Sequence, residues 1–346
     1  MRKIRTERIW ISSCSGAKFA IRNWKPAILL SALLLALCSS AEAQQPKKIP
    51  RIGYLSSGVR QEGDAREEAF REGLREFGYI DGKNITIEYR FAEANLDKVR
   101  GLAAELVSLN VDLIVAITTT GALAAKNATQ RIPIVMRIAA DPVDEGLIAN
   151  LARPGGNITG VTSLIQELGG KRLELLKEVI PRLARVAVLR IPSPGSLKWL
   201  REWEAAGHGL GLQLQSLGVR SANDIDEAFT VSIKERIGAM TAIRHPFINS
   251  QRKRIVELAI KNRLPTIFDD NDFVEAGALM YYGANLLVLQ RRLAYFVDKI
   301  LKGGKPAEIP VEQPTKFELV INLRTAKQIR LTIPQSVLYR ADKVIK

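Results

Sequence analysis

The sequence predicts an α/β protein with two doubly wound parallel-sheet lobes, joined by a hinge and separated by an interlobe cleft. From Arg51 onward, short β-branched runs alternate with longer segments of helical period, which is the pattern of βαβ units in a parallel sheet. The turn-forming stretch 151–157 interrupts this alternation, which then resumes and indicates a second sheet. No glycine-rich dinucleotide fingerprint is present, so we expect the strand-end loops of the two sheets to form a cleft.

The first lobe begins with alternating strands and helices. Its first helix places Ala69, Phe70, Leu74 and Phe77 on one face, and Gly78 ends it. We predict strands over 51–55, 85–89, 112–117 and 134–138, and helices over 64–77, 97–109 and 121–128. Together, these strands are predicted to form one sheet.

The second lobe begins after a short apolar strand, 158–163, that closes the first. We predict its helices over 170–179, 196–209, 225–235 and 249–262, and its strands over 185–190, 213–219, 239–243, 265–268 and 279–282. The helix 286–301 and the segment 308–321 are expected to cross back to the first lobe. The first lobe is therefore predicted to contain 49–162 plus about 285–346, and the second lobe 163–284.

Residues 1–43 have the order of a secretory signal peptide. A basic stretch leads into the apolar run 27–38, which is followed by Ala41-Glu42-Ala43. The run is shorter than the roughly 20 residues that span a bilayer, so a permanent membrane anchor is the weaker interpretation. A lipoprotein anchored at Cys38 is a further alternative, although Leu37 is bulky for that processing. We expect cleavage after Ala43 and a periplasmic protein.

Both cysteines of the chain, Cys14 and Cys38, fall inside this leader. The mature protein then has no disulfide, no thiolate catalysis and no cysteine metal site. Without the leader the net charge drops from +15 to +10, since 44 basic and 34 acidic residues remain. The densest basic clusters, 252–254 and 291–292, lie on amphipathic helical patterns and are explained by solvated faces. No helix-turn-helix signal is present, so we expect no nucleic-acid partner.

Several segments of the chain, taken together, resemble those of a known protein family. They read GYLSSG (53–58), LARPGGNITGVTS (151–163), GKRLELLKEVIPRLARVAVL (170–189), FVEAGALMYYGANL (273–286) and EQPTKFELVINLRTAKQIRLTIPQSVLYRADKVI (312–345). They resemble the ABC transporter substrate-binding family related to tryptophan and tyrosine uptake proteins, which has the type I periplasmic-binding fold. The resemblance covers 49–345. It implies a receptor that captures a small-molecule solute and delivers it to the membrane permease and ATPase subunits of an ABC importer.

The chain departs from the family pattern near the expected cleft. Ala278 stands where the family has glycine, and Tyr281 where it has serine. Arg137 lies close to a loop that is usually free of charge. These departures weaken the transfer of an aromatic amino acid ligand to this chain, so the solute stays open.

Hydroxyl-rich loops follow two strands of the first sheet. They contain Ser56 and Ser57 after the first strand, and Thr118, Thr119 and Thr120 after the third. A helix N-terminus with free N–H groups can hold a carboxylate, so these loops are candidate anion sites. Ordinary helix N-capping by the same hydroxyls is the alternative.

Other candidate ligand contacts lie at the remaining strand exits: Asp141, Ser163, Ser193, His245, Asp269 and Tyr282. Asp141 can receive a ligand ammonium or cap a helix beginning near Val143. His245, beside a proline, is more typical of a loop hydrogen bond than of catalysis. Strand alternation directs only one of Tyr281 and Tyr282 into the cleft, and we favour Tyr282.

The acidic run 269–272 lacks the register of a calcium loop, so we predict no metal site. The chain has no G-x-S-x-G elbow, phosphate loop or H-E-x-x-H motif, and we expect neither catalytic residues nor a cofactor. The predicted function is solute capture by hinge closure for an ABC-type importer, with a small carboxylate-bearing solute such as an amino acid or aromatic acid. A secreted sensor that presents its solute to a membrane receptor or kinase is the alternative, and a two-lobed enzyme is a third possibility.

Overall fold

The computed structural model describes residues 48–60, 63–165 and 167–346, and residues 49–346 form one compact unit. The predicted leader, with Cys14 and Cys38, lies outside the described residues. In the ranges that are described, no helix is both long and apolar enough to cross a membrane.

The first lobe is built on a five-stranded, fully parallel sheet with the strand order β2-β1-β3-β4-β5. Its strands are β1 (Arg51–Ser56), β2 (Thr86–Phe91), β3 (Leu113–Ala116), β4 (Ile134–Ile138) and β5 (Ile158–Thr162). This arrangement confirms the predicted α/β class with doubly wound parallel sheets. Gly160 allows the close approach of β5 to β4, because a Cβ there would lie 2.1 Å from the Met136 carbonyl oxygen.

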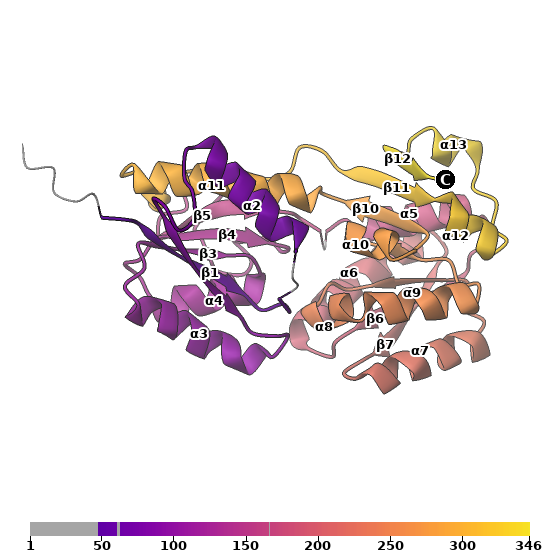
Figure 1. Cartoon of the computed structure of the whole chain (residues 1–346). Helices are drawn as coiled ribbons and strands as arrows, with labels where there is room; N and C mark the ends of the chain where they lie inside the picture. Colours follow the sequence, from indigo (N-terminus) through magenta and orange to yellow (C-terminus); the bar gives the residue numbers. More distant parts are fainter. Residues whose placement is uncertain (1–47, 61–62, 166) are drawn as a thin grey trace, which may run out of the picture. The chain divides into compact units, whose positions relative to one another are not determined.

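Helices cover both faces of this sheet because successive strand residues point to opposite sides. Tyr54 and Val115 pack toward α2 and α11, whereas Leu55 and Ala116 pack toward α3 and α4. The helices are α2 (Ala65–Glu76), α3 (Leu96–Ser108), α4 (Thr119–Ala128) and α11 (Leu286–Leu301). Figure 1 shows α11 beside α2 although the two are far apart in the sequence.

The second lobe repeats the same winding. Its parallel strands β6, β7 and β8 have the order β7-β6-β8, and an isolated bridge from Met240 to Thr266 links β8 to the start of β9. A four-stranded sheet of order β12-β11-β10-β9 continues from there. The strands are β6 (Arg185–Arg190), β7 (Gln213–Gly218), β8 (Ala239–Ala242), β9 (Ile267–Phe268), β10 (Met280–Gly283), β11 (Glu318–Asn322) and β12 (Lys343–Ile345).

Two groups of helices cover the second lobe on opposite faces. One hydrophobic cluster joins α5 and α6 to the sheet, and the other joins α7, α9 and α10 to it. The elements are α5 (Gly169–Val179), α6 (Pro194–Gly209), α7 (Ala222–Lys234), α8 (Pro246–Ser250), α9 (Arg252–Lys261), α10 (Asn271–Glu275), α12 (Leu323–Gln328) and α13 (Gln335–Leu338). The short η1 (Pro306–Glu308) lies against β5 of the first lobe. The helix predicted over 249–262 is therefore two helices that meet at Gln251.

The C-terminal region is divided between the lobes. The sequence assigned about 285–346 to the first lobe, and α11 packs there against α2. The Val311 and Glu312 amides also donate to the first-lobe carbonyls of Leu151 and Gly160. In contrast, β11 pairs antiparallel with β10 and belongs to the second lobe, so that part of the assignment is wrong. Strand periodicity identifies the buried side chains of β11 but not the strand with which it pairs.

The chain passes between the lobes three times, after β5, after β10 and before β11 (Figure 1). Such crossings are where a two-lobed protein can hinge.

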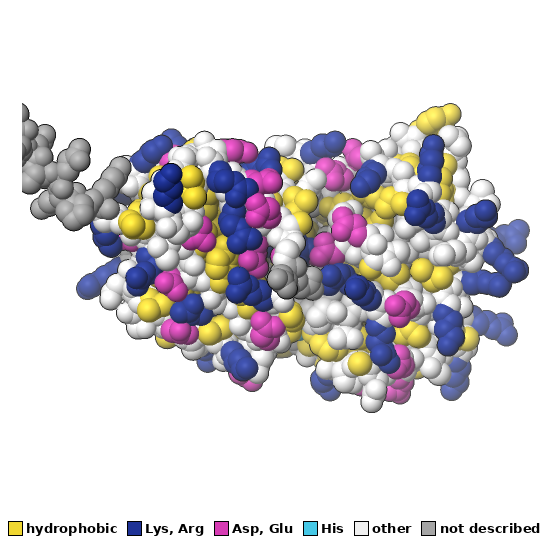
Figure 2. All heavy atoms as spheres, in the orientation of Figure 1, with side chains coloured by type: hydrophobic (Ala, Val, Ile, Leu, Met, Phe, Trp, Pro, Cys, Tyr) yellow, Lys and Arg dark blue, Asp and Glu magenta, His cyan; other side chains and the backbone are white. Residues whose placement is uncertain are grey.

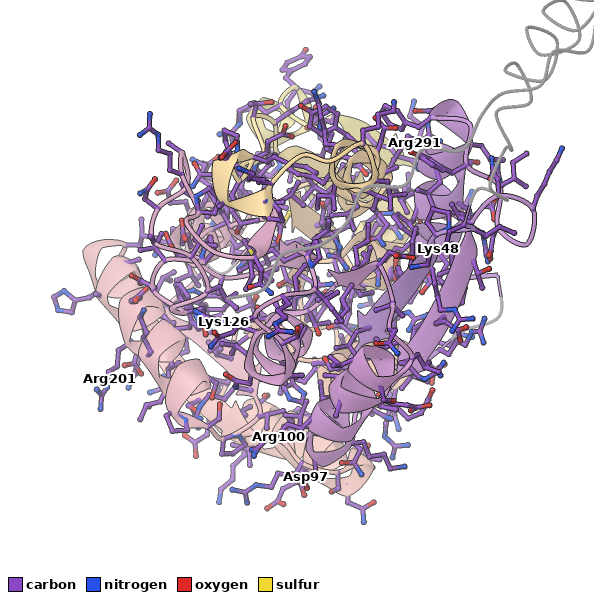
Figure 3. The ribbon with its side chains drawn as sticks, turned by 90° about the vertical axis from the view of Figure 1, so that its left-hand side faces the viewer. Lys48, Asp97, Arg100, Lys126, Arg201 and Arg291 are labelled. Atoms are coloured by element: carbon purple, nitrogen blue, oxygen red, sulfur yellow. The ribbon has the colours of Figure 1, made fainter. Side chains whose placement is uncertain are left out.

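Basic and acidic side chains are mixed on the surface. Figure 2 shows Lys and Arg interspersed with Asp and Glu on the face in view. Three arginines of the predicted basic clusters form ion pairs: Arg254 with Asp226, Arg291 with Glu72 and Arg292 with Glu312. Arg201 is exposed on α6, and Figure 3 shows it on a different helix from other labelled surface charges. The positive excess is therefore spread out.

Candidate functional site

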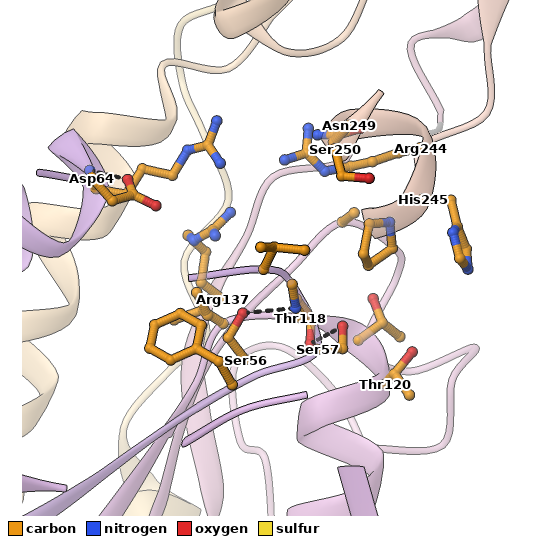
Figure 4. Close-up of a pocket in the computed structure, with 18 of the residues that line it drawn as sticks. Ser56, Ser57, Asp64, Thr118, Thr120, Arg137, Arg244, His245, Asn249 and Ser250 are labelled. Atoms are coloured by element: carbon orange, nitrogen blue, oxygen red, sulfur yellow. Dashed lines mark hydrogen bonds between the residues drawn. The ribbon is translucent and has the colours of Figure 1, made fainter. Parts of the chain in front are cut away.

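The candidate site lies where the strand order reverses in each sheet. In the first lobe β1 and β3 are neighbours, and in the second β6 and β8 are neighbours, so the loops that follow them meet at the carboxyl edge of each sheet. A cavity of about 240 Å³ is lined by residues of both lobes, with Ser57 and Thr118 on one side and His245 and Asn249 on the other (Figure 4).

The two hydroxyl-rich loops of the first lobe meet at the carboxyl edge of the sheet. The Ser57 hydroxyl donates to Thr118 Oγ1 over 3.0 Å, and the Gly121 amide donates to the same oxygen over 3.1 Å. Thr118 is thus the N-cap of α4, which is the capping alternative, and it is also part of the cavity wall; anion binding by this loop stays a prediction. The Ser56 hydroxyl accepts from the Gly58 amide and holds the first loop in place.

Guanidinium groups from four elements line the cavity. They are Arg66 from the first turn of α2, Arg137 from β4, Arg244 from the loop after β8, and Arg252 at the start of α9. Arg66 Nη2 donates to Asp270 Oδ1 and to Asp272 Oδ2, each over 2.7 Å. These contacts join the first lobe to the second.

Asp270 is the centre of this network. It is 1% exposed, caps α10, and accepts hydrogen bonds from Arg244 Nη2 at 2.9 Å and Asn249 Nδ2 at 2.8 Å. Burial alone would raise the pKa of Asp270, but Arg66 and Arg244 more than offset it and hold the pKa well below its usual range. Asp270 therefore forms ion pairs with both Arg66 and Arg244.

Arg137 differs from Arg66 and Arg244. It is 5% exposed, and no Asp or Glu in the part of the chain that the structure describes forms an ion pair with it. Its Nε donates to Gln290 Oε1 over 2.7 Å, and Gln290 Nε2 donates to the Tyr54 hydroxyl over 2.9 Å. Burial, with Arg244 and Arg66 nearby, lowers the pKa of Arg137 to about 10, so it is still a cation at neutral pH.

Arg137 is also held in a fixed direction. The Gln290 contact occupies Nε, while no described residue is hydrogen-bonded to the two terminal nitrogens. Figure 4 shows this guanidinium directed into the cavity. A buried cation without a counterion is costly, so the geometry suits an anionic ligand group at this point.

His245 supplies a second donor. Its Nδ1 accepts from the Phe247 amide over 3.2 Å, and burial lowers its pKa to about 4. The ring is therefore neutral at pH 7 with its proton on Nε2, the nitrogen available to donate.

The rest of the cavity wall is partly apolar. Tyr54 and Phe91 line it, with ring centroids 6.0 Å apart, and so do Ile117 and Ala139. The cavity therefore has a charged side and an apolar side, and a ligand with one charged end and an apolar body fits it.

The remaining predicted contacts do not line this cavity. The Asp141 carboxylate accepts hydrogen bonds from the amides of Val143 and Asp144, as expected if it caps the segment that follows it. That segment is a turn and not the predicted helix. The Ser163 hydroxyl is buried and donates to the Ile138 carbonyl.

Three further candidates have other surroundings. Ser193 caps α6 and lines an adjoining hollow of about 150 Å³ that it shares with Thr119 and His245. Asp269 is buried 3.7 Å from Arg244. Tyr282 packs against Phe317, with ring centroids 6.2 Å apart.

The cavity therefore contains Ser56, Ser57, Thr118, Thr119, Thr120 and His245 of the predicted residues. Sequence reasoning missed Arg66, Arg244, Asn249 and Phe91. Arg244 could have been predicted from the sequence, because it directly precedes His245 at a strand exit. Arg66 could not, because its position inside a helix does not indicate a binding residue. Over the described ranges, no cluster of three or more His, Cys, Asp or Glu side chains is arranged to hold a metal ion.

Known proteins resemble the chain over most of its length. The chain is 28% identical over 287 residues to the tyrosine-binding protein of Clostridioides difficile, covering 82% of this chain and 81% of that protein. A structure of an ABC domain in complex with L-Trp from Streptococcus pneumoniae is 29% identical with a TM-score of 0.75, covering 85% of this chain and all of that one. A conserved domain protein from Vibrio cholerae gives 27% identity and a TM-score of 0.78, covering 86% of this chain and all of that one.

The family model described as ABC transporter substrate binding protein matches residues 60–345. Members of such a family bind a substrate and do not transform it. The two-lobed parallel-sheet architecture is the type I periplasmic-binding fold of these relatives. The chain therefore belongs to the family of ABC transporter substrate-binding proteins.

Proposed function

We propose that this protein is the extracytoplasmic solute-binding protein of an ABC-type importer, and that it captures a small carboxylate-bearing solute, an amino acid or an aromatic acid, between its lobes. The observation that carries the proposal is Arg137, a buried cation that faces the cavity without an acidic partner among the described residues. A ligand carboxylate supplies the missing negative charge, and a guanidinium can bind it through two parallel hydrogen bonds.

The relatives support this ligand class. One is named for tyrosine and another was solved with L-Trp, and both ligands carry a carboxylate beside an apolar body. The apolar wall formed by Phe91 and Ile117 next to Arg137 suits a ligand with a carboxylate at one end and an apolar body at the other. The cavity is also small enough for a single small solute.

We further propose that binding is coupled to hinge closure. Ser57, Thr118 and Arg137 approach the ligand from the first lobe, and His245 and Asn249 from the second, so only a closed form makes all contacts at once. Ligand binding then shifts the population toward that form, which the permease can recognise.

The proposed location follows from residues 1–43. Secretion and cleavage after Ala43 predict a mature chain that begins at Gln44. Mass spectrometry of the protein recovered from the periplasm tests this point, and an uncleaved or cytoplasmic chain would contradict it.

A thermal-shift screen of the purified protein tests the ligand class. Amino acids, aromatic acids and other small carboxylates are compared with their neutral amides. A ligand at 100 times its dissociation constant stabilises the folded state by about 2.7 kcal/mol. Stabilisation by carboxylates that is lost in Arg137→Gln supports the proposal, while stabilisation by the amides alone contradicts it.

The importer partnership needs a separate test. The permease and ATPase encoded nearest to this chain are reconstituted in liposomes, and ATP hydrolysis is measured with and without the ligand-loaded protein. Stimulation supports transport, and its absence across such partners contradicts it.

A further inference from the structure

We infer that the solute carries a carboxylate but no protonated amine, so that the protein selects an organic acid over the amino acid of the same shape. The inference rests on the proposed function and narrows its ligand class. It depends on how the charges in the cavity are paired.

The positive side of the cavity is available to a ligand. Arg137 has no acidic partner among the described residues, and its terminal nitrogens are directed into the cavity (Figure 4). The neutral His245 ring adds an Nε2 donor, because its Nδ1 already accepts from the Phe247 amide. Arg137 directs its donors into the cavity, His245 is part of the cavity wall, and donors bind an anion.

The acidic side chains that line the cavity already have partners within the protein. Asp64 and Asp272 are the carboxylates that line the cavity among the described residues. Asp64 Oδ1 accepts from the Arg66 amide over 2.8 Å and caps α2, while Asp272 Oδ2 accepts from the Arg66 guanidinium over 2.7 Å. Asp272 is therefore ion-paired with Arg66, whereas Asp64 is bound by a backbone amide at the N-terminus of α2 and adds, after Asp270 and Asp272, to the negative charge that raises the pKa of Arg66. A ligand ammonium needs a carboxylate whose charge is not already balanced.

The surroundings of Arg137 also repel a second cation. Arg66 and Arg244 lie close enough to lower the pKa of Arg137 itself, as does its burial. In an α-amino acid the ammonium lies only two bonds from the carboxylate carbon, so it would enter the same positive field. Like charges at this separation oppose binding strongly in a poorly solvated site.

The Arg137 guanidinium cannot turn easily to relieve this repulsion. Gln290 is fully buried and bridges Arg137 to the Tyr54 hydroxyl, so the guanidinium is held by a chain of two hydrogen bonds. Phe91 and Ile117 then form an apolar wall for the rest of the solute. The ligand class that fits is a small carboxylic acid with an apolar or aromatic body.

Isothermal titration calorimetry of the purified protein tests this with pairs that differ only by the α-amino group. The pairs are tyrosine with 3-(4-hydroxyphenyl)propanoate, tryptophan with 3-(indol-3-yl)propanoate, leucine with 4-methylpentanoate, and aspartate with butanedioate. We expect the acid of the best-binding pair to bind at least tenfold more tightly than its amino acid. Tyramine, which has the amine without the carboxylate, should show no binding.

Two variants assign the effect to its cause. Arg137→Gln should weaken acid binding at least tenfold, and Arg137→Lys should recover part of it, while circular dichroism checks that both are folded. Arg201→Gln, an exposed arginine on α6, is the control and should bind like the parent protein.

The possible failures are distinguishable. If an amino acid binds as tightly as its acid, and Asp64→Asn removes that binding, then Asp64 receives the ammonium. The inference is then wrong, while the proposed capture of a carboxylate stands. If no member of either series binds, the proposed function and the inference both fall.

Discussion

Arg66 on α2 donates to Asp270 at the start of α10 over 2.7 Å, although the two residues are 204 positions apart in the chain. The side chains are 19% and 1% exposed, so this is a largely buried ion pair between the lobes. It holds the second lobe against the first at the edge of the cavity. Several properties of the protein should depend on it.

Removal of the Arg66 charge should open the protein. In Arg66→Met, Asp270 still binds Arg244 but loses its partner in the other lobe. This loss should destabilise the closed form relative to the open form by about 1–3 kcal/mol. Small-angle X-ray scattering should then give a larger radius of gyration without ligand, and ligand affinity should fall about tenfold. Arg75→Met on the same helix removes an exposed pair with Glu68 and should change neither quantity. Unchanged scattering in Arg66→Met would show that this pair does not hold the lobes together.

The stability of the protein should fall in mild acid because of His245. Its folded-state pKa of about 4 lies below the ordinary value of 6.5, so the unfolded chain binds the proton more readily. The stability contributed by the neutral ring is present above pH 6.5 and is lost as the pH falls toward 4. We expect His245 to account for about 2 kcal/mol of the loss between pH 7 and 4.5.

His245→Asn is the test, because asparagine can still cap the helix that follows but does not titrate. Urea unfolding at the two pH values should show a smaller loss in this variant than in the parent. His208→Asn, at the exposed end of α6, should behave like the parent. Equal losses in all three proteins would contradict the assignment to His245.

Gly160 should not tolerate a side chain. Its φ is +135°, and a Cβ there would lie 2.1 Å from the Met136 carbonyl oxygen in the neighbouring strand. Gly160→Ala should therefore lower the free energy of unfolding by about 3 kcal/mol or more. Gly156→Ala, where nothing lies within 4 Å, provides the control. Equal urea midpoints for the two variants would mean that β5 can move away from β4 without cost.

The two hydroxyl-rich loops should contribute to ligand binding together. Ser57 and Thr119 line the cavity from neighbouring strand ends. The double variant Ser57→Ala/Thr119→Ala should weaken a carboxylate ligand by about 2 kcal/mol, or roughly thirtyfold, in calorimetric titrations. Thr230→Ala, on the exposed side of α7, should leave the affinity unchanged. An unchanged affinity in the double variant would exclude these loops as the anion site.

Local sequence was sufficient for much of the fold. The short apolar runs of β1 and β3 predicted buried parallel strands, and both strands form close to the expected residues. Because the carboxyl ends of parallel strands share one edge, the two candidate loops that contain Ser57 and Thr118 lie at the same edge of the sheet. Their hydroxyls are 3.0 Å apart.

The sequence could not predict which distant side chains would be paired. Asp269 was expected in the cleft, but it is buried against Arg244, and its neighbour Asp270 binds Arg66 from the other lobe. Tyr282 was expected to cover the ligand and instead packs on Phe317. These outcomes depend on contacts between segments that are far apart in the chain, for which local periodicity holds no information.

The sequence by itself determined the class of this protein: its alternating strands and helices, the interruption at 151–157 and its family motifs define two parallel-sheet lobes with loops at one edge. Only the tertiary structure decided the charge of the site, because it paired Arg66 and Arg244 with Asp270 and left Arg137 facing the cavity without an acidic partner among the described residues. The physical reason is that burial and the position of counterions set the effect of a charge, and both arise only when the two lobes come together.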